Sequence, residues 1–325
     1  MQTTSTDDLN FHTQIQNTME YDLLFPNSGA RDTFEAIKKS LTNHSFEKFH
    51  TPIPGEDYTL DHYQVSKKDG DASYYYPEKI KKDKIVLHFT AGKLPGDMRS
   101  LTTKDRHIST AFLIGRDGTI YKLFASSGHW SYHLGRGAVG GNTHQSSRSI
   151  GIELSNWGPL KKSGERITTW GDVNFCKASQ TAAYQKIDTP FRAASYFANH
   201  TDQQYEGLIV LLRYLTAVYQ IPRSFLPAQD RDIPFSSKEA ARNYTGICSH
   251  VNFRHSGKWD IGPAFNWAKL KEGMKDGYKP KLTRSRGLEM ITHSSETEIE
   301  AAMMSRGMEF GNTDSSIYGE DGPEI

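Results

Sequence analysis

The chain has 325 residues, enough for one large domain or for one medium-sized domain with attached segments. Its 39 basic and 38 acidic side chains nearly cancel, so no electrostatic footprint for nucleic acid or an anionic membrane is visible. No apolar run approaches the roughly 20 residues that span a bilayer, and the polar N-terminus lacks the features of a Sec signal peptide. The two cysteines, Cys176 and Cys248, are far from any CxxC spacing and are interpreted as buried free thiols, with a disulfide as the alternative.

The N-terminal part is predicted to contain little regular structure. Residues 1 to about 30 are polar and without periodicity, and they are interpreted as an arm. A helix cap begins at Asp32, and a helical face behind it is shared by Phe34, Ile37 and Leu41. From there to about residue 80 the chain is rich in Pro, Gly, Tyr and charge, which favours a locally packed, irregular segment over a substrate or partner surface.

Residues 84–90, KIVLHFT, form a compact apolar run between charges and an Ala-Gly pair, which predicts a buried strand. His88 lies near the carboxyl end of this strand, where α/β folds commonly present functional groups. A lone strand histidine is usually structural. The sharp exit at Thr90-Ala-Gly92 favours an imidazole that faces a cleft instead.

A β-hairpin is predicted over residues 109–124, because the Asp-Gly pair at 117–118 separates two β-rich runs. The loop that follows, WSYHLG, carries Trp130 and His133. These side chains could contact a sugar or a peptide carbonyl, or they could equally plug the edge of the sheet. Gly, Asn and Ser dominate residues 135–147, which predicts a mobile loop.

A second buried strand is predicted over residues 149–155, with Glu153 on the opposite face from Ile152 and Leu154. A carboxylate in mid-strand is costly to bury unless it is paired or lies close to a metal. The alternative is an exposed position on an edge strand. Residues 157–200 are interpreted as an inserted, partly extended excursion without recognisable chemistry.

The second half of the chain is predicted to be mainly helix and loop. A long amphipathic helix that packs on the sheet follows the capping box at Thr201 and stops at Ile221-Pro222. A polar loop is expected over residues 223–244. Beyond Gly277 the chain turns polar, with a short helix capped at Ser295 and an acidic tail.

Residues 247–267, ICSHVNFRHSGKWDIGPAFNW, bring His250, Lys258 and Asp260 into one short segment, and Pro263 is well placed to start a helix. Imidazole nitrogen and carboxylate oxygen are donors that a borderline metal such as zinc accepts. A metal ion and an ammonium group repel each other. Their proximity therefore makes sense if negative charge develops between them, as it does when water attacks a carbonyl.

In order along the chain, five motifs resemble those of the zinc-dependent N-acetylmuramoyl-L-alanine amidases of type 2. They are the His88 strand, the RDGTIY hairpin, the WSYHLG loop, the SIGIEL strand and the SHVNFRHSGKWDIGPAFNW segment. This family is related to peptidoglycan recognition proteins and phage lysozyme-amidases, and the resemblance covers residues 80–272. We expect an α/β fold of three layers, with a mixed central sheet and helices on both faces. The expected catalytic domain is 80–276, with the insertion at about 157–200, between extensions at 1–79 and 277–325.

The resemblance implies a role for each candidate residue. Three of them match zinc ligands and leave the fourth tetrahedral position to water, as in catalytic zinc sites; they are His88, His250 and Asp260. Glu153 matches a carboxylate that serves as general base, and Lys258 matches a lysine that stabilises the oxyanion together with zinc. Trp130 and His133 fall in a substrate-contacting stretch, although Ser131 and Tyr132 separate them here.

The implied function is zinc-dependent hydrolysis of the amide bond between N-acetylmuramic acid and L-alanine in peptidoglycan. Two alternatives stay open: a non-catalytic peptidoglycan-binding protein of the same fold, and a cytoplasmic amidase that recycles soluble muropeptides. The absence of a Sec signal is compatible with the cytoplasm or with a non-Sec route such as phage lysis or an injection apparatus. The extensions exceed what recycling needs, which favours a lysin whose extensions bind a delivery or structural partner.

Overall fold

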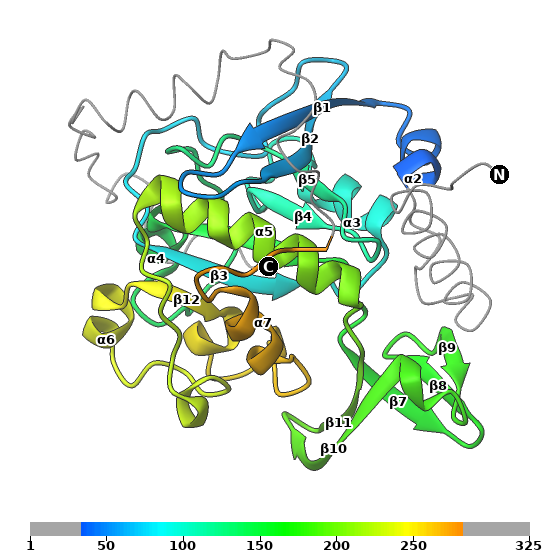
Figure 1. The fold of residues 1–325 in the computed structure, drawn as a ribbon. Coiled ribbons are helices and arrows are strands. Elements are labelled where there is room, and N and C mark those ends of the chain that lie inside the picture. Colours follow the sequence, from blue (N-terminus) through cyan, green and yellow to red (C-terminus); the bar gives the residue numbers. More distant parts are fainter. Residues whose placement is uncertain (1–33, 282–325) are drawn as a thin grey trace, which may run out of the picture.

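The computed structural model describes residues 34–281 (Figure 1). The expected arm, the helix at Ser295 and the acidic tail lie outside these residues. Within the described range, no helix has the length and hydrophobicity needed to cross a membrane.

A seven-stranded sheet forms the centre of the fold, with the strand order β1-β2-β5-β4-β6-β3-β12 (Figure 1). Its strands are β1 (His44–Pro52), β2 (Thr59–Lys67), β3 (Lys84–Phe89), β4 (Phe112–Ile114), β5 (Ile120–Lys122), β6 (Ser149–Leu154) and β12 (Gly246–Ser249). The pairs β12/β3, β3/β6, β4/β6 and β2/β5 are parallel, whereas β1/β2 and β4/β5 are antiparallel. The sheet is therefore mixed, as expected.

One face of the sheet is covered by the long helix α5 (Asp202–Tyr219) and by α7 (Trp267–Gly273), and α7 contacts α5. The capping box that Thr201 forms with Gln204 starts α5 as predicted. Alternate residues of the central strands point into this core, among them Ile85, Ile152 and Ile247. The same core includes apolar residues of α2 (Phe34–Ser40) and α3 (Leu94–Leu101).

The opposite face is covered by α4 (Asn142–Arg148) and α6 (Lys238–Asn243). Val86 and Cys248 point to this side and pack with Ala241 in a second, smaller core. Sheet residues that alternate between the two cores confirm the three-layer arrangement. Both cysteines are buried and free, which rules out the disulfide alternative.

Three segments differ from the prediction. The stretch expected to be irregular forms the antiparallel pair β1 and β2, and its Pro- and Gly-rich part is the turn between them. The predicted mobile loop ends in α4, and the predicted loop over 223–244 contains α6. Both are short helices of polar sequence, in which the apolar periodicity needed to recognise a helix is weak. Because β1 and β2 belong to the central sheet, that sheet crosses the predicted domain boundary at residue 80.

Helix α7 begins later than predicted. Pro263 was expected at its first position, but the helix starts at Trp267. The Asn266 side chain caps it by accepting a hydrogen bond from the backbone N–H of Lys269, at 2.9 Å. Asparagine is among the strongest N-cap residues, and here it sets the start of the helix.

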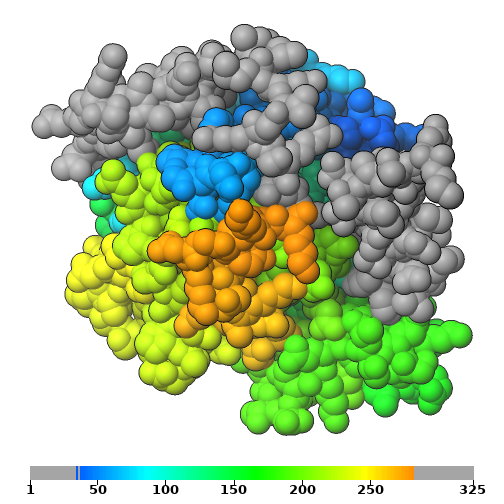
Figure 2. Space-filling model, viewed as in Figure 1, coloured from blue at the N-terminus to red at the C-terminus, as the bar shows by residue number. Residues whose placement is uncertain are grey.

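The insertion folds into a separate five-stranded sheet with the order β10-β11-β7-β8-β9. Its strands are β7 (Pro159–Ser163), β8 (Arg166–Thr169), β9 (Asn174–Lys177), β10 (Tyr184–Phe191) and β11 (Ala194–Ala198). A small core of its own holds it together, including Leu160, Ile167 and Phe175. The sheet projects from the body as a lobe, seen in green at the lower right of Figures 1 and 2.

Candidate metal centre and catalytic cleft

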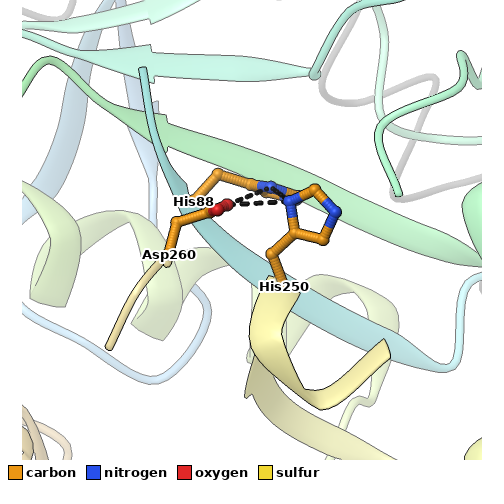
Figure 3. A group of neighbouring side chains, drawn as sticks. All are labelled: His88, His250 and Asp260. Carbon is orange, nitrogen blue, oxygen red and sulfur yellow. Dashed lines mark hydrogen bonds and ion pairs between the residues drawn. The ribbon is translucent and has the colours of Figure 1, made fainter. Parts of the chain in front are cut away.

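Three predicted ligands meet at the carboxyl edge of the central sheet. Strands β3 and β12 are parallel neighbours in which Leu87 pairs with Ser249, so the next residue of each strand emerges at the same edge. These residues are His88, in β3, and His250, the first residue of the 3-10 helix η3 (His250–Phe253). Asp260 returns to them from the loop after η3, and Figure 3 shows the three side chains pointing at one another.

The donor atoms of this group are close enough to share one ion. His250 Nδ1 lies 2.8 Å from Asp260 Oδ2, and His88 Nδ1 lies 3.1 Å from the same oxygen and 3.0 Å from His250 Nδ1 (Figure 3). Ligands about 2.0–2.1 Å from a tetrahedral zinc ion are separated by about 3.3 Å. The set of two imidazoles and one carboxylate therefore fits a divalent metal of the zinc type.

The tautomer of His250 suits metal binding. Its Nε2–H donates a hydrogen bond to the carbonyl oxygen of Leu134 at 2.9 Å, which leaves the lone pair on Nδ1, the atom that faces the other ligands. Burial lowers the pKa of His88 to about 4, so this imidazole is neutral at pH 7. Neutral imidazole is the form that ligates metals.

A directed chain of hydrogen bonds sets the tautomer of His88. The Ser149 hydroxyl donates to the carbonyl oxygen of Gln145 at 2.6 Å, so it accepts the Nε2–H of His133 at 2.9 Å. His133 Nδ1 is then an acceptor, and the Nε2–H of His88 donates to it at 2.9 Å. The lone pair of His88 is thereby placed on Nδ1, toward the other two ligands.

His133 thus lies behind His88, a candidate metal ligand, and is only 5% exposed. Gly151 makes room for its ring, because a Cβ there would come within 3.1 Å of the imidazole and 2.8 Å of Thr110 Cγ2. A glycine inside a strand often marks such a close approach. His133 also lines the cleft, and its expected contact with substrate stays a prediction.

Trp130 does not join the site. It is 1% exposed, it packs against Tyr76 with ring centroids 4.4 Å apart, and its Nε1–H donates to Glu78 Oε2 at 3.0 Å. It is not among the residues that line the cleft. The geometry gives no support to a substrate contact by Trp130, and it fits the alternative that this part of the loop packs against the fold.

Glu153 pairs in register with His88 across β3 and β6, and both side chains point away from α5. The predicted alternation is confirmed, because Ile152 and Leu154 are buried in the core on the other face. Glu153 lines the cleft, and its Oε2 is buried without a hydrogen-bond partner. Burial raises the pKa of this carboxyl group well above its usual value, and the negative charge of Asp260 adds to the shift.

Lys258 lines the same cleft from the loop that carries Asp260, and its positive charge opposes the rise in the pKa of Glu153. The cleft has a volume of about 440 Å³ and contains all of the predicted site residues except Trp130. It therefore joins a metal-type donor set, a carboxyl group with a raised pKa and an ammonium group.

Sequence reasoning missed two contributions from the insertion. Arg192, in the β10–β11 turn, donates to the carbonyl oxygens of Lys258 and Arg254 and so fastens the loop of the site. Trp170, in the β8–β9 turn, lines the cleft. A tryptophan followed by Gly-Asp between two β-rich runs is a local signal that could have identified the second turn.

Comparison with known proteins supports these observations. Residues 78–263, more than half of the chain, match the family model described as N-acetylmuramoyl-L-alanine amidase. No curated protein matches the chain.

Solved amidase structures also resemble it. The Escherichia coli amidase AmiD, in complex with anhydro-N-acetylmuramic acid-L-Ala-D-gamma-Glu-L-Lys, is 20% identical, with 69% of this chain and 65% of that chain covered and a TM-score of 0.39. AmpDh3 of Pseudomonas aeruginosa, in complex with anhydromuramic pentapeptide, is 17% identical, with 61% of this chain and 61% of that chain covered and a TM-score of 0.37. The endolysin LysCS of Clostridium intestinale is 17% identical, with 61% of this chain and 87% of that chain covered and a TM-score of 0.31. This chain thus covers less than two thirds of the length of AmiD and of AmpDh3. By its match to the family model, the chain belongs to the N-acetylmuramoyl-L-alanine amidase family.

Proposed function

We propose that the protein hydrolyses the amide bond between the lactyl group of N-acetylmuramic acid and the L-alanine of the stem peptide. Family membership supports the bond and the substrate class. The observation that carries the proposal is the convergence of three metal-type donors beside an unpartnered, buried carboxylate oxygen of Glu153 in one cleft.

The residues of the cleft divide the chemistry among them. Zinc held by His88, His250 and Asp260 would polarise the scissile carbonyl and lower the pKa of water in the site. Glu153 takes a proton from the attacking water and returns it to the leaving amine, a task suited to a carboxyl group whose pKa burial raises well above its usual value. Lys258 supplies positive charge to the oxyanion that forms on the carbonyl oxygen.

Digestion of purified sacculi, with mass analysis of the products, tests the proposal. The zinc-loaded protein should release soluble peptides that begin with L-alanine and leave the glycan strands intact. Glu153→Gln should bind zinc normally and release nothing. A zinc-loaded parent as inert as Glu153→Gln would refute the proposal and favour a peptidoglycan-binding protein without turnover.

The form of the substrate and the place of action belong to the same proposal. We expect the wall polymer to be cleaved faster than soluble muropeptides, as suits a lytic enzyme delivered by a non-Sec route. The segments 1–79 and 277–325 are candidates for binding a delivery or structural partner. Rates on sacculi and on a soluble muropeptide at equal stem-peptide concentration distinguish lysis from recycling.

A further inference from the structure

The insertion forms one wall of the catalytic cleft. Within residues 34–281, three large apolar side chains are prominently exposed: Trp170 at 46%, Val173 at 50% and Ile233 at 51%. Two of the three, Trp170 and Val173, lie in the β8–β9 turn and line the cleft, whereas Ile233 does not. Exposed apolar side chains gathered at the mouth of a site indicate a binding surface rather than chance exposure.

The exposed turn is held in a defined conformation. Lys161 Nζ donates to the carbonyl oxygen of Trp170 at 3.0 Å and lies 5.0 Å from the centre of its ring. Thr169 and Val173 close the turn, because the N–H of Thr169 donates to the Val173 carbonyl oxygen at 2.9 Å. The N–H of Val173 in turn donates to Thr169 Oγ1 at 3.2 Å. A side chain presented by an ordered turn loses less conformational entropy on binding a ligand.

The lobe is also tied to the loop that carries the catalytic groups. Arg192 donates to the carbonyl oxygens of Lys258 and Arg254, and Trp259 Nε1–H donates back to the Arg192 carbonyl oxygen at 3.1 Å. The rings of Trp170 and Trp259 are 6.1 Å apart at an angle of 37°. The aromatic wall is thus continuous with the part of the cleft that contains Lys258 and Asp260.

The chemistry of this wall suits a sugar better than a stem peptide. The residues that the insertion contributes to the lining of the cleft are all uncharged. They are Trp157, Pro159, Thr169, Trp170, Gly171 and Val173. Two cationic side chains of the insertion are already hydrogen-bonded: Lys161 donates to the Trp170 carbonyl oxygen, and Arg192 donates to the Lys258 carbonyl oxygen. A stem peptide carries carboxylates that call for free cations, whereas the face of a pyranose ring presents C–H groups that pack on an aromatic ring.

We propose that the insertion is a glycan-binding wall, on which Trp170 stacks against a pyranose ring of the peptidoglycan strand next to the cleavage site. This inference rests on the proposed function for the position of the scissile bond. It assigns the lobe to the glycan side of the substrate and leaves the rest of the cleft to the stem peptide.

Binding measurements with two separated halves of the substrate test the wall. The full-length protein carrying Glu153→Gln is titrated with peptide-free glycan strands and, separately, with glycan-free stem peptide. Adding Trp170→Ala should weaken glycan binding about tenfold or more, as expected for removal of an aromatic anchor, and should leave stem-peptide binding unchanged. Trp170→Phe, which keeps an aromatic face, should retain most of the affinity for glycan.

Ile233→Ala is the matched control, because Ile233 is equally exposed but lies outside the cleft. Equal melting temperatures of the Ala variants and the Glu153→Gln parent show that the fold is intact. Glycan affinity that is absent in the parent or unchanged by Trp170→Ala would overturn the inference, as would a selective loss of stem-peptide binding.

The outcome is separable from that of the proposed function. Glycan binding that depends on Trp170 in a protein that releases no peptide from sacculi would leave the wall standing and refute the amidase activity. Release of peptides from sacculi by a protein whose glycan binding does not depend on Trp170 would support the amidase activity and refute the glycan-binding wall.

Discussion

His133 is expected to control metal affinity without touching the metal. It accepts the Nε2–H of His88 and donates its own Nε2–H to Ser149, which is itself committed to a backbone carbonyl oxygen. Replacing His133 by Phe removes the acceptor. His88 then either keeps a buried N–H without a partner, at a cost of about 1–3 kcal/mol, or shifts its proton to Nδ1 and loses the lone pair that faces the ion.

The loss in zinc affinity should therefore be about 10- to 100-fold, the range found when outer partners of ligating histidines are removed. His133→Asn keeps an oxygen near the position of Nδ1 and should recover much of the affinity. His255→Ala changes an exposed histidine outside the cleft and should have no effect.

Competition with a chromophoric chelator gives the Kd of each variant directly. Nitrogen-15 NMR of the imidazoles reports the tautomer of His88. An unchanged Kd in His133→Phe, together with an unchanged His88 tautomer, would refute the role assigned to the hydrogen-bond chain. A Kd that rises equally in His133→Asn and His133→Phe would instead trace the effect to lost packing.

Three further predictions concern charge and metal. Lys258→Met should lower kcat by about 10²–10³-fold, as for loss of one oxyanion donor, without weakening zinc binding, since the ammonium group repels the ion. Removal of zinc by a chelator should lower the Tm by about 10 °C, because a ligand present at 1,000 times its Kd adds about 4 kcal/mol to the free energy of unfolding. In the Asp260→Asn variant the chelator should lower the Tm by less. Burial lowers the pKa of Lys82 to about 7, so between pH 7 and 9 the native protein loses a proton that the unfolded chain keeps. The free energy of unfolding should therefore rise with pH over this window by about 2 kcal/mol more in the parent than in Lys82→Met, and equal pH dependence in urea titrations of the two would contradict this.

The sequence predicts well those parts of the site whose chemistry is local. An apolar run with a histidine at its carboxyl end indicates β3 and His88, and alternation alone assigns Glu153 to the face opposite Ile152. The three ligands were inferred from residue type and from resemblance, and their side chains do converge. Parallel pairing of β12, β3 and β6 then brings together residues that are distant along the chain.

Contacts made by one segment on a distant one could not be predicted in this way. The role of Arg192 depends on two backbone carbonyl oxygens more than sixty residues away, and an arginine in a turn carries no local sign of such partners. His133 presented a similar problem, since the partners of its ring, His88 and Ser149, come from β3 and β6. Both α4 and the β1–β2 hairpin were missed because their polar sequences lack the periodicity that marks an element.

The location of the cleft follows from the same alternation that builds the core. Side chains of the central strands that face α5 are apolar, so any polar chemistry must lie on the other face. On that face, Val86 and Cys248 pack with α6 toward the amino ends of their strands, and the next residues on the same side, His88 and His250, lie beyond that core. A shift of β3 by one residue would turn His88 toward α5 and an apolar side chain toward the cleft. The strand register thus determines where the candidate metal ligands lie, and the lobe formed by residues 157–198 adds Trp170 and Val173 to the lining of the same cleft.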